Sequence, residues 1–137
     1  MTPAAMAALH TACFTTPRPW SACELTGIMG TPGVFLSESA FGFALGRVVV
    51  DEAELLTLAV SPAHRRHGTG RALLAAFEAE ARAEGARTAF LEVSADNAAA
   101  LALYESSDYR QTGQRPGYYT GPDGTRIDAL IYAKSLD

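Results

Sequence analysis

Long apolar runs are absent from this 137-residue sequence, so no membrane-spanning helix of about 18 apolar residues is predicted. The N-terminus also lacks the basic region and apolar core of a secretory signal, which makes a cytoplasmic location the default. Basic residues are outnumbered, with 11 Lys and Arg against 15 Asp and Glu and a net charge of −4. Nucleic acid is therefore not an expected partner, and a mildly acidic surface favours a basic one. The length predicts a single domain over residues 1–137.

Cysteine is scarce as well. Cys13 and Cys23 are the two in the chain, and without further cysteines they predict small apolar groups rather than a disulfide framework. A zinc site built from His10 and Cys13 would lack further ligands at suitable spacing, so no metal site is expected. His64 and His67 are interpreted as exposed loop residues.

The pattern of apolar residues predicts an α/β (α+β) domain with one mixed, mostly antiparallel sheet and helices on both faces. Helices are expected over 3–14, from Ser21 to Gly27 or Gly30, over 70–83, and from Asp96 or Asn97 to about 106. Strands are expected over 34–36, 41–50, 53–60, 88–94, 109–114 and 127–134, the first three forming an antiparallel meander. A glycine-rich turn over 117–124 should include Tyr118 and Tyr119.

The helix over 70–83 has the clearest pattern in the chain. Its buried stripe is predicted to contain Leu73, Leu74, Phe77 and Ala81, with Gly85 ending the helix. The charged residues that are expected to face water are Glu78, Arg82 and Glu84.

The segment from Ser61 to Leu74, SPAHRRHGTGRALL, joins an apolar strand to this helix through a basic, glycine-containing loop. Unpaired N–H groups at the start of a helix attract anions, so the loop predicts a phosphate or pyrophosphate site. A P-loop is excluded because no Gly-Lys-Ser/Thr triplet is present. A dinucleotide fingerprint is excluded because Leu73 stands where a third glycine or alanine would be needed.

What remains is the pattern Arg65-x-x-Gly68-x-Gly70, preceded by Val60-x-Pro62. It resembles the pyrophosphate loop of the GCN5-related N-acetyltransferases (GNAT), which bind acetyl-CoA. The resemblance implies the GNAT fold.

Glu92 is the second candidate for chemistry. It lies within the apolar strand segment Phe90-Leu91-Glu92-Val93, where burial would raise a carboxyl pKa and suit a general base; a glutamate on an exposed strand face is the alternative. On the following helix, Asn97, Leu101 and Tyr104 fall on one face. Asn97 is equally interpretable as an N-cap, and Tyr104 as a core aromatic with its hydroxyl at the rim.

Further motifs resemble one branch of that family, the bacterial acetyltransferases (RimI) of the N-terminal alanine of ribosomal protein S18. They cover nearly the whole chain and comprise Pro19-Trp20-Ser21, Asp51-Glu52-Ala53, Leu91-Glu92-Val93, the segment 97–105, Tyr109, Arg115-x-x-Tyr118-Tyr119, Asp123-Gly124 and 128–131. The resemblance implies Glu92 as proton acceptor and Tyr104 as proton donor. It also implies that the strand ending at Val60 and the strand of Glu92 splay apart. The implied acetyl-CoA contacts are Leu58, Ala59 and Val60 for the pantetheine arm, Arg65, Arg66, His67, Gly68, Thr69, Gly70 and Arg71 for the pyrophosphate, and Asn97.

Three departures from this branch are present. The family's first strand precedes its first helix, so the sheet is expected to lack an edge strand. Asp108 replaces a glycine and should adopt the left-handed turn. The run Gln114-Arg115-Pro116-Gly117 replaces a more basic one where the acceptor peptide should bind.

The expected activity is therefore direct transfer of acetyl from acetyl-CoA to a basic protein or peptide N-terminus, with S18 as the suspected acceptor. Neither cysteine is expected near the site. Acetylation of a lysine or a small-molecule amine, or CoA binding without turnover, remains open.

Overall fold

The predicted helices and strands are all present in the computed structural model, which describes residues 1–14, 18–65 and 67–137. The elements are α1 (Pro3–Cys13), α2 (Ala22–Met29), β1 (Val34–Ser39), β2 (Gly42–Val49), β3 (Glu52–Val60), a 3₁₀ turn (Pro62–His64), α3 (Thr69–Ala83), β4 (Thr88–Ser94), α4 (Ala98–Ser106), β5 (Arg110–Thr120) and β6 (Arg126–Ser135).

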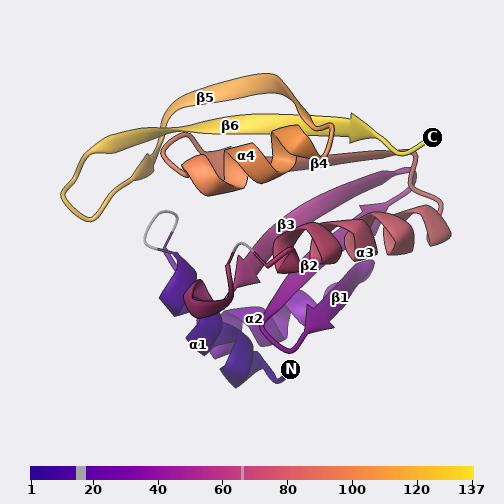
Figure 1. Cartoon of the computed structure of the whole chain (residues 1–137), viewed down its shortest axis with the longest axis horizontal. Helices are drawn as coiled ribbons and strands as arrows, with labels where there is room; N and C mark the ends of the chain where they lie inside the picture. Colours follow the sequence, from indigo (N-terminus) through magenta and orange to yellow (C-terminus); the bar gives the residue numbers. More distant parts are fainter. Residues whose placement is uncertain (15–17, 66) are drawn as a thin grey trace.

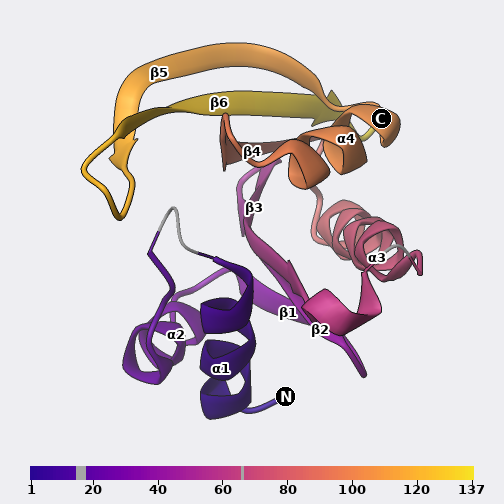
Figure 2. The same cartoon turned by 60° about the vertical axis from the view of Figure 1, so that its left-hand side comes forward.

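The strands form one six-stranded sheet in the order β1-β2-β3-β4-β6-β5 (Figure 1). Of the strand pairs that the structure describes, only β3–β4 is parallel, which confirms the predicted mixed, mostly antiparallel sheet. Helices α1 and α2 pack on one face of the sheet, and α3 and α4 pack on the other (Figure 2). The helices are therefore on both faces, as predicted.

Local capping chemistry explains where the helices begin and end. Ser21 accepts a hydrogen bond from the backbone of Glu24, and the Glu24 side chain accepts one from Ser21, which forms a capping box at the start of α2. That helix ends at Gly30 rather than Gly27. Gly85, with φ of +92°, follows α3, and Asp108, with φ of +72°, adopts the left-handed turn expected of it.

A β-bulge in β3 decides which side chains face the two helical layers. Leu45 is paired with Thr57 and Gly46 with Leu55, so Leu56 is an extra residue on β3. Because strand side chains alternate, this extra residue moves Thr57 and the residues after it to the opposite face from the one that strict alternation would give. Thr57 consequently faces α1, and Leu58 packs against the α3 core.

The strands β3 and β4 separate soon after they begin. Their parallel pairing runs from Glu52 opposite Thr88 to Glu54 opposite Phe90. Beyond that point the two strands diverge, as Figure 2 shows. The second half of β3 is thus not paired with the second half of β4, which is the separation that the family resemblance implied. We call this break in the strand pairing the slot.

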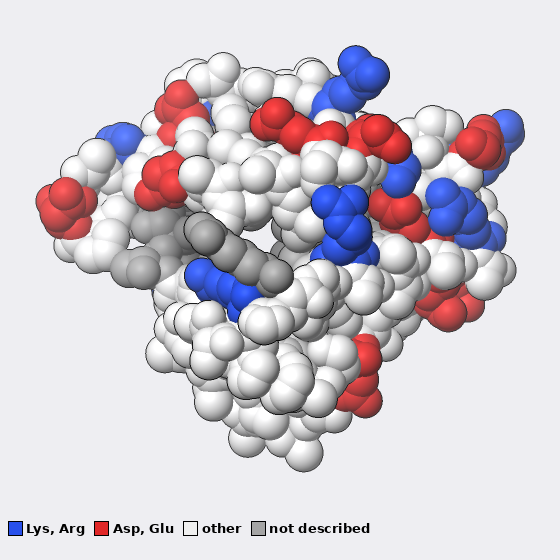
Figure 3. Space-filling model, viewed as in Figure 1, with Lys and Arg blue, Asp and Glu red and all other residues white. Residues whose placement is uncertain are grey.

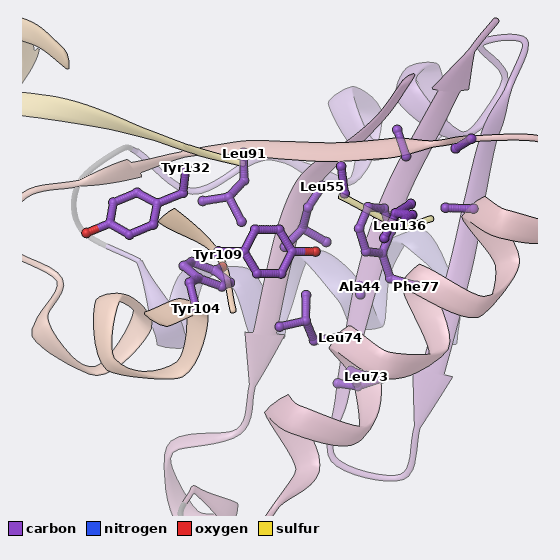
Figure 4. Packing of buried hydrophobic residues seen from close by; sticks show 14 of the residues in the cluster. Ala44, Leu55, Leu73, Leu74, Phe77, Leu91, Tyr104, Tyr109, Tyr132 and Leu136 are labelled. Atoms are coloured by element: carbon purple, nitrogen blue, oxygen red, sulfur yellow. The ribbon is translucent and has the colours of Figure 1, made fainter. Parts of the chain in front are cut away.

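The larger core cluster lies between the sheet and α3 and α4. Figure 4 shows Leu91 of β4, Tyr104 of α4 and Tyr109 packed with Leu74 and Phe77 of α3. The rings of Tyr104 and Tyr109 are 6.0 Å apart at their centroids. The predicted α3 stripe is thereby confirmed, since each of its apolar members is buried.

Glu78 is the exception on α3, because it is buried instead of facing water as predicted. Its carboxylate accepts a hydrogen bond from Tyr109 Oη at 3.0 Å and pairs with Lys134 Nζ at 2.9 Å. These partners lie 31 and 56 residues further along the chain. Helical periodicity alone places Glu78 at the edge of the apolar face of α3. The contacts with Tyr109 and Lys134 compensate for the cost of burying its charge.

The last hairpin is also longer than predicted. Strand β5 continues through Tyr118 and Tyr119 to Thr120, so both tyrosines belong to a strand and not to the turn. The turn is confined to 121–125. Between Arg115 and Tyr119, β5 has two more residues than β6, and this interrupts the backbone pairing of the two strands. Gly117 lies in this interruption, so the sequence around it resembled a turn.

His10 joins α1, the segment before α2, and β3. Its Nδ1 accepts a hydrogen bond from the Trp20 backbone at 3.0 Å, so its Nε2 carries the proton and donates to Thr57 Oγ1 at 2.9 Å. The ring stacks on Phe14 and Trp20. Burial lowers the pKa of His10 from 6.5 to about 4, against a smaller opposing effect of Glu24.

We expect His10 to make the fold sensitive to acid. The unfolded chain binds a proton at His10 near pH 6.5 and the folded chain only near pH 4, so stability is full above pH 6.5 and falls as pH drops toward 4. The loss is at most about 3 kcal/mol. Urea unfolding of the wild type and His10→Gln from pH 7 to 4 would test this: the variant should be less stable at pH 7 and should lose less on acidification. Parallel pH dependence in both proteins would contradict it.

Candidate active site

At the slot, the second half of β3 has no pairing partner on β4. Ser61 donates its N–H to Phe41 of the β1–β2 turn at 2.8 Å. Because backbone groups alternate in direction along a strand, those of Val60 and Leu58 point away from β2 and into the slot. The main-chain groups of Leu58 and Val60, two of the predicted pantetheine contacts, are therefore not hydrogen-bonded to β2. The side chain of Ala59, the third predicted contact, is buried among the residues that pack on α1 and α2.

Cys13 contacts this edge of the slot, contrary to the prediction that both cysteines lie away from the site. Its Sγ donates to the Val60 carbonyl oxygen at 3.1 Å. Arg65 Nε lies 3.4 Å from the same oxygen. The sequence could not show this contact, because Cys13 and Val60 are 47 residues apart and meet only when α1 packs against β3. Cys23 is exposed on α2.

The glycine loop has the geometry that an anion site needs. Gly68 has φ of +79° and precedes α3 without a side-chain cap, so the N–H groups of the first turn have no side-chain acceptor among the described residues. A Cβ added at Gly68 would meet nothing within 4 Å. A Cβ at Gly70 would lie 3.3 Å from Leu103 of α4, so glycine allows α3 to approach α4 closely. Thr69 is the first residue of the helix.

The basic side chains of the loop are placed less uniformly. Arg71 donates to Ser106 Oγ at 2.9 Å and so connects the start of α3 with the end of α4. His67 is exposed, and Arg66 lies outside the described residues. His64 differs from its prediction, because it stacks on Phe41 with ring centroids 3.6 Å apart and is only partly exposed.

Glu92 projects from β4 on the face opposite Leu91 and Val93, which are buried against α3 and α4. Its side chain is 26% exposed, between the two predicted alternatives of a buried base and an open strand face. Its Oε1 is 3.2 Å from Arg115 Nη2. This ion pair joins β4 to β5, with β6 between the two strands.

Glu54 and Arg115 belong to the same surface as Glu92. The sequence did not assign Glu54 to the site, and it placed Arg115 only in the run where the acceptor peptide should bind. Glu54 is opposite Phe90 in the β3–β4 pairing, so it lies on the same face as Glu92, one strand away. Burial, and then the charge of Glu92, raise the pKa of Glu54. Glu54 could have been found from the sequence as a polar residue that alternates with apolar ones in the strand predicted over 53–60. Arg115 could have been found as a basic residue three positions before the paired tyrosines.

Tyr104 and Asn97 both serve structural roles in addition to any catalytic one. Burial raises the pKa of Tyr104, so its phenol stays protonated at neutral pH. The described residues supply no hydrogen bond to its hydroxyl. Asn97 caps α4 by accepting from the Ala100 backbone at 3.2 Å. Tyr104 lies on the α3 and α4 side of the sheet and Glu92 projects from the other face, so the structure does not bring these two predicted catalytic groups together on one face.

Charge is unevenly distributed around this site. Figure 3 shows charged side chains of both signs over the upper part of the molecule, where α3, α4, β5 and β6 lie, and few of them over α1. In the described part of the chain, no helix is long and apolar enough to span a membrane. The same residues contain no group of three or more His, Cys, Asp or Glu placed to hold a metal ion.

The profile of the acetyltransferase (GNAT) family matches residues 5–109. A [ribosomal protein bS18]-alanine N-acetyltransferase of Escherichia coli (strain K12) is 48% identical over 91 residues, which are 66% of this chain and 61% of that protein. The protein of the same name from Haemophilus ducreyi is 36% identical over 122 residues, covering 86% of this chain and 84% of that protein.

A solved structure supports the same relationship. The crystal structure of the ribosomal-protein-S18-alanine N-acetyltransferase from Escherichia coli superimposes with a TM-score of 0.85 at 36% identity. The match covers 98% of this chain and 87% of that one.

Proposed function

This chain belongs to the acetyltransferase (GNAT) family, and we propose that it transfers an acetyl group from acetyl-CoA to a protein N-terminal α-amine. The observation that carries the proposal is the slot, where main-chain groups of β3 have no partner on β4 and lie next to the glycine loop at the start of α3. The N-terminal alanine of ribosomal protein S18 is the proposed acceptor, because the relatives named above act on it. The match to the E. coli relative spans only 61% of that protein's length.

The residues present fit acetyl-CoA at this place. The uncapped first turn of α3, with Gly68 open on its outer side, would hold the pyrophosphate together with the basic side chains of Arg65 and Arg71. Backbone groups of Leu58 and Val60 would bind the pantetheine arm in the manner of an added strand. Acetyl-CoA supplies an activated thioester, so the enzyme needs no nucleophile of its own.

The residues of the chain itself would then be needed for proton transfer. An α-amino group has a pKa of about 8 and is largely protonated at neutral pH, so it must lose a proton before it can attack. We assign the proton acceptor to Glu92, whose carboxylate is partly exposed beside the slot. The proton donor to the departing thiolate is Tyr104, which burial keeps protonated. Attack is direct, in a ternary complex, with one base and one acid on the two faces of the sheet.

A peptide panel tests the acceptor. Peptides with a free N-terminal alanine, with a blocked N-terminus and an internal lysine, and with a different first residue would be incubated with acetyl-CoA and analysed by mass spectrometry. We expect acetylation at the free α-amine alone. Acetylation of the lysine peptide with equal efficiency would contradict an N-terminal specificity, and tight acetyl-CoA binding without transfer to any amine would favour a binding module.

Two matched glycines test the cofactor site. Gly68 and Gly124 both have a φ near +80° and both leave a new Cβ without contacts within 4 Å. Ala at either position should cost about 1 kcal/mol of stability, because the left-handed conformation disfavours a side chain. Only Gly68→Ala should also weaken acetyl-CoA binding, by about tenfold in a calorimetric titration, because only Gly68 lies at the start of α3. Equal affinities of the two variants for acetyl-CoA would show that the glycine loop is not part of the cofactor site.

A further inference from the structure

Arg115 has two partners at the site. Its guanidinium is 3.2 Å from the Glu92 carboxylate and 5.0 Å from the centre of the Tyr118 ring. The Arg115 side chain is half exposed, at 50%, so neither contact confines it. Tyr118 is itself exposed and packs edge-on against Tyr119 at 5.2 Å. Arg115 can therefore leave Glu92 and keep a favourable cation–π contact with Tyr118.

The backbone that presents Arg115 is fixed by its neighbours on β6. Asp128 accepts hydrogen bonds from the Gly117 backbone at 2.7 Å and from Gln114 Nε2 at 2.6 Å. Arg126 Nε donates to the Gly117 carbonyl at 2.8 Å. These bonds fix the two extra residues of β5 on both sides of the interruption. The freedom of Arg115 therefore lies in its side chain and not in the strand.

Charges around Glu92 come from three strands. Arg115 and the phenol of Tyr119 face it from β5, and Glu54 faces it from β3. Arg47 of β2 is opposite Glu54 and completes a row of charges across the sheet. Arg115 is the one cation in direct contact with Glu92 among the described residues. An α-ammonium that is to give its proton to Glu92 must therefore compete with Arg115 for that carboxylate.

We propose that Arg115 is a positioning and specificity residue that pairs with Glu92 until an acceptor α-ammonium replaces it, whereupon Arg115 moves onto Tyr118. The proposal rests on the proposed function, because it assumes that Glu92 receives the acceptor's proton. The exchange replaces one cation by another, so Glu92 is never left facing the slot without a counter-charge. A neutral amine or a blocked N-terminus cannot make this exchange, which selects for a free, protonated terminus.

Steady-state kinetics of Arg115→Met with an alanine-terminated peptide test the exchange. Without the competing cation, we expect the acceptor KM to fall about two- to fivefold, as suits the loss of a half-exposed ion pair. The acidic limb of the pH–rate profile should move to higher pH, since a proton is no longer opposed by the guanidinium. The rate on the alkaline plateau should be unchanged. Arg115→Lys, which keeps the charge, should restore most of the wild-type behaviour.

Arg110→Met is the matched control, because Arg110 is an exposed arginine at the start of the same strand. It should leave KM and the pH profile as in the wild type. A higher KM in Arg115→Met with an unmoved acidic limb would overturn the proposal and assign Arg115 to direct binding of the peptide. An unchanged KM with an unmoved limb would overturn it as well.

A measurement without turnover separates this proposal from the proposed function. In a calorimetric titration with CoA present, the alanine-terminated peptide should bind more tightly to Arg115→Met than to the wild type, whether or not acetyl transfer occurs. If no amine is acetylated but the affinity for the peptide rises, the proposed function fails while the competition of Arg115 for Glu92 is supported. Equal peptide affinities in both proteins would overturn the competition itself.

Discussion

Replacing Glu92 by glutamine is expected to lower the rate of acetyl transfer about a hundredfold or more, because the amide cannot accept the proton of the acceptor amine. The side chain keeps its size, so the β4 strand and the slot should be preserved. The rate should rise steeply with pH, since only the fraction of amine that is already deprotonated can then attack. The measurement is a pH–rate profile from pH 6 to 10 with an alanine-terminated peptide.

The control for this variant is Glu52→Gln, an exposed glutamate at the start of β3 on the edge of the same surface. It should leave the pH–rate profile unchanged. Acetyl-CoA affinity should be similar in the wild type and both variants, because the proposed cofactor contacts lie on the other side of the slot. If Glu92→Gln kept the wild-type profile, Glu92 would not be the proton acceptor, and Glu54 would be the next carboxylate to replace.

Replacing Lys134 by methionine is expected to destabilise the protein by about 3 kcal/mol and to lower its melting temperature by roughly 10 °C. Among the described residues, the change leaves the buried Glu78 carboxylate with only the Tyr109 hydroxyl at 3.0 Å and Arg82 at 4.0 Å. A buried charge without a close counter-charge costs more than the ion pair itself contributes. Urea unfolding at pH 7 measures the loss.

Two further variants identify the cause of that loss. Glu78→Gln in the Lys134→Met background should recover most of it, because the amide is neutral and still accepts from Tyr109. Arg87→Met, which breaks the exposed pair with Asp137, should cost no more than about 1 kcal/mol. A double variant as unstable as Lys134→Met alone would show that Lys134 acts through its apolar packing and not through its charge.

Much of the fold was predictable because the signals for it are local. The capping pair of Ser21 and Glu24 and the helix-ending Gly85 specify helix ends from a few neighbouring residues. The apolar period of α3 predicted its buried face, and the left-handed turn at Asp108 was predicted because Asp108 replaces a glycine of the related family. The glycine loop could be interpreted for the same reason, since a helix start without a cap is a property of adjacent residues.

The errors arose where partners are distant in sequence. Glu78 looked like a surface residue until β6 and Tyr109 supplied a cation and a hydroxyl. Tyr118 and Tyr119 looked like turn residues because Gly117 precedes them, but pairing with β6 extends the strand. Cys13 reaches Val60 only through the packing of α1 on β3. Each of these required a contact across more than 30 residues or a strand pairing that no local pattern reports.

The sequence by itself determined the helices, the strands and the glycine loop, because each depends on the spacing of neighbouring residues. Only the tertiary structure decided how the residues of the candidate site lie relative to one another. The bulge at Leu56 is hidden within an uninterrupted apolar run, yet it sets the faces of Leu58 and Thr57. The separation of β3 from β4 after three paired residues opens the slot, and the sheet order brings Arg115 to Glu92. Register and strand order depend on the whole sheet, so no single segment specifies them.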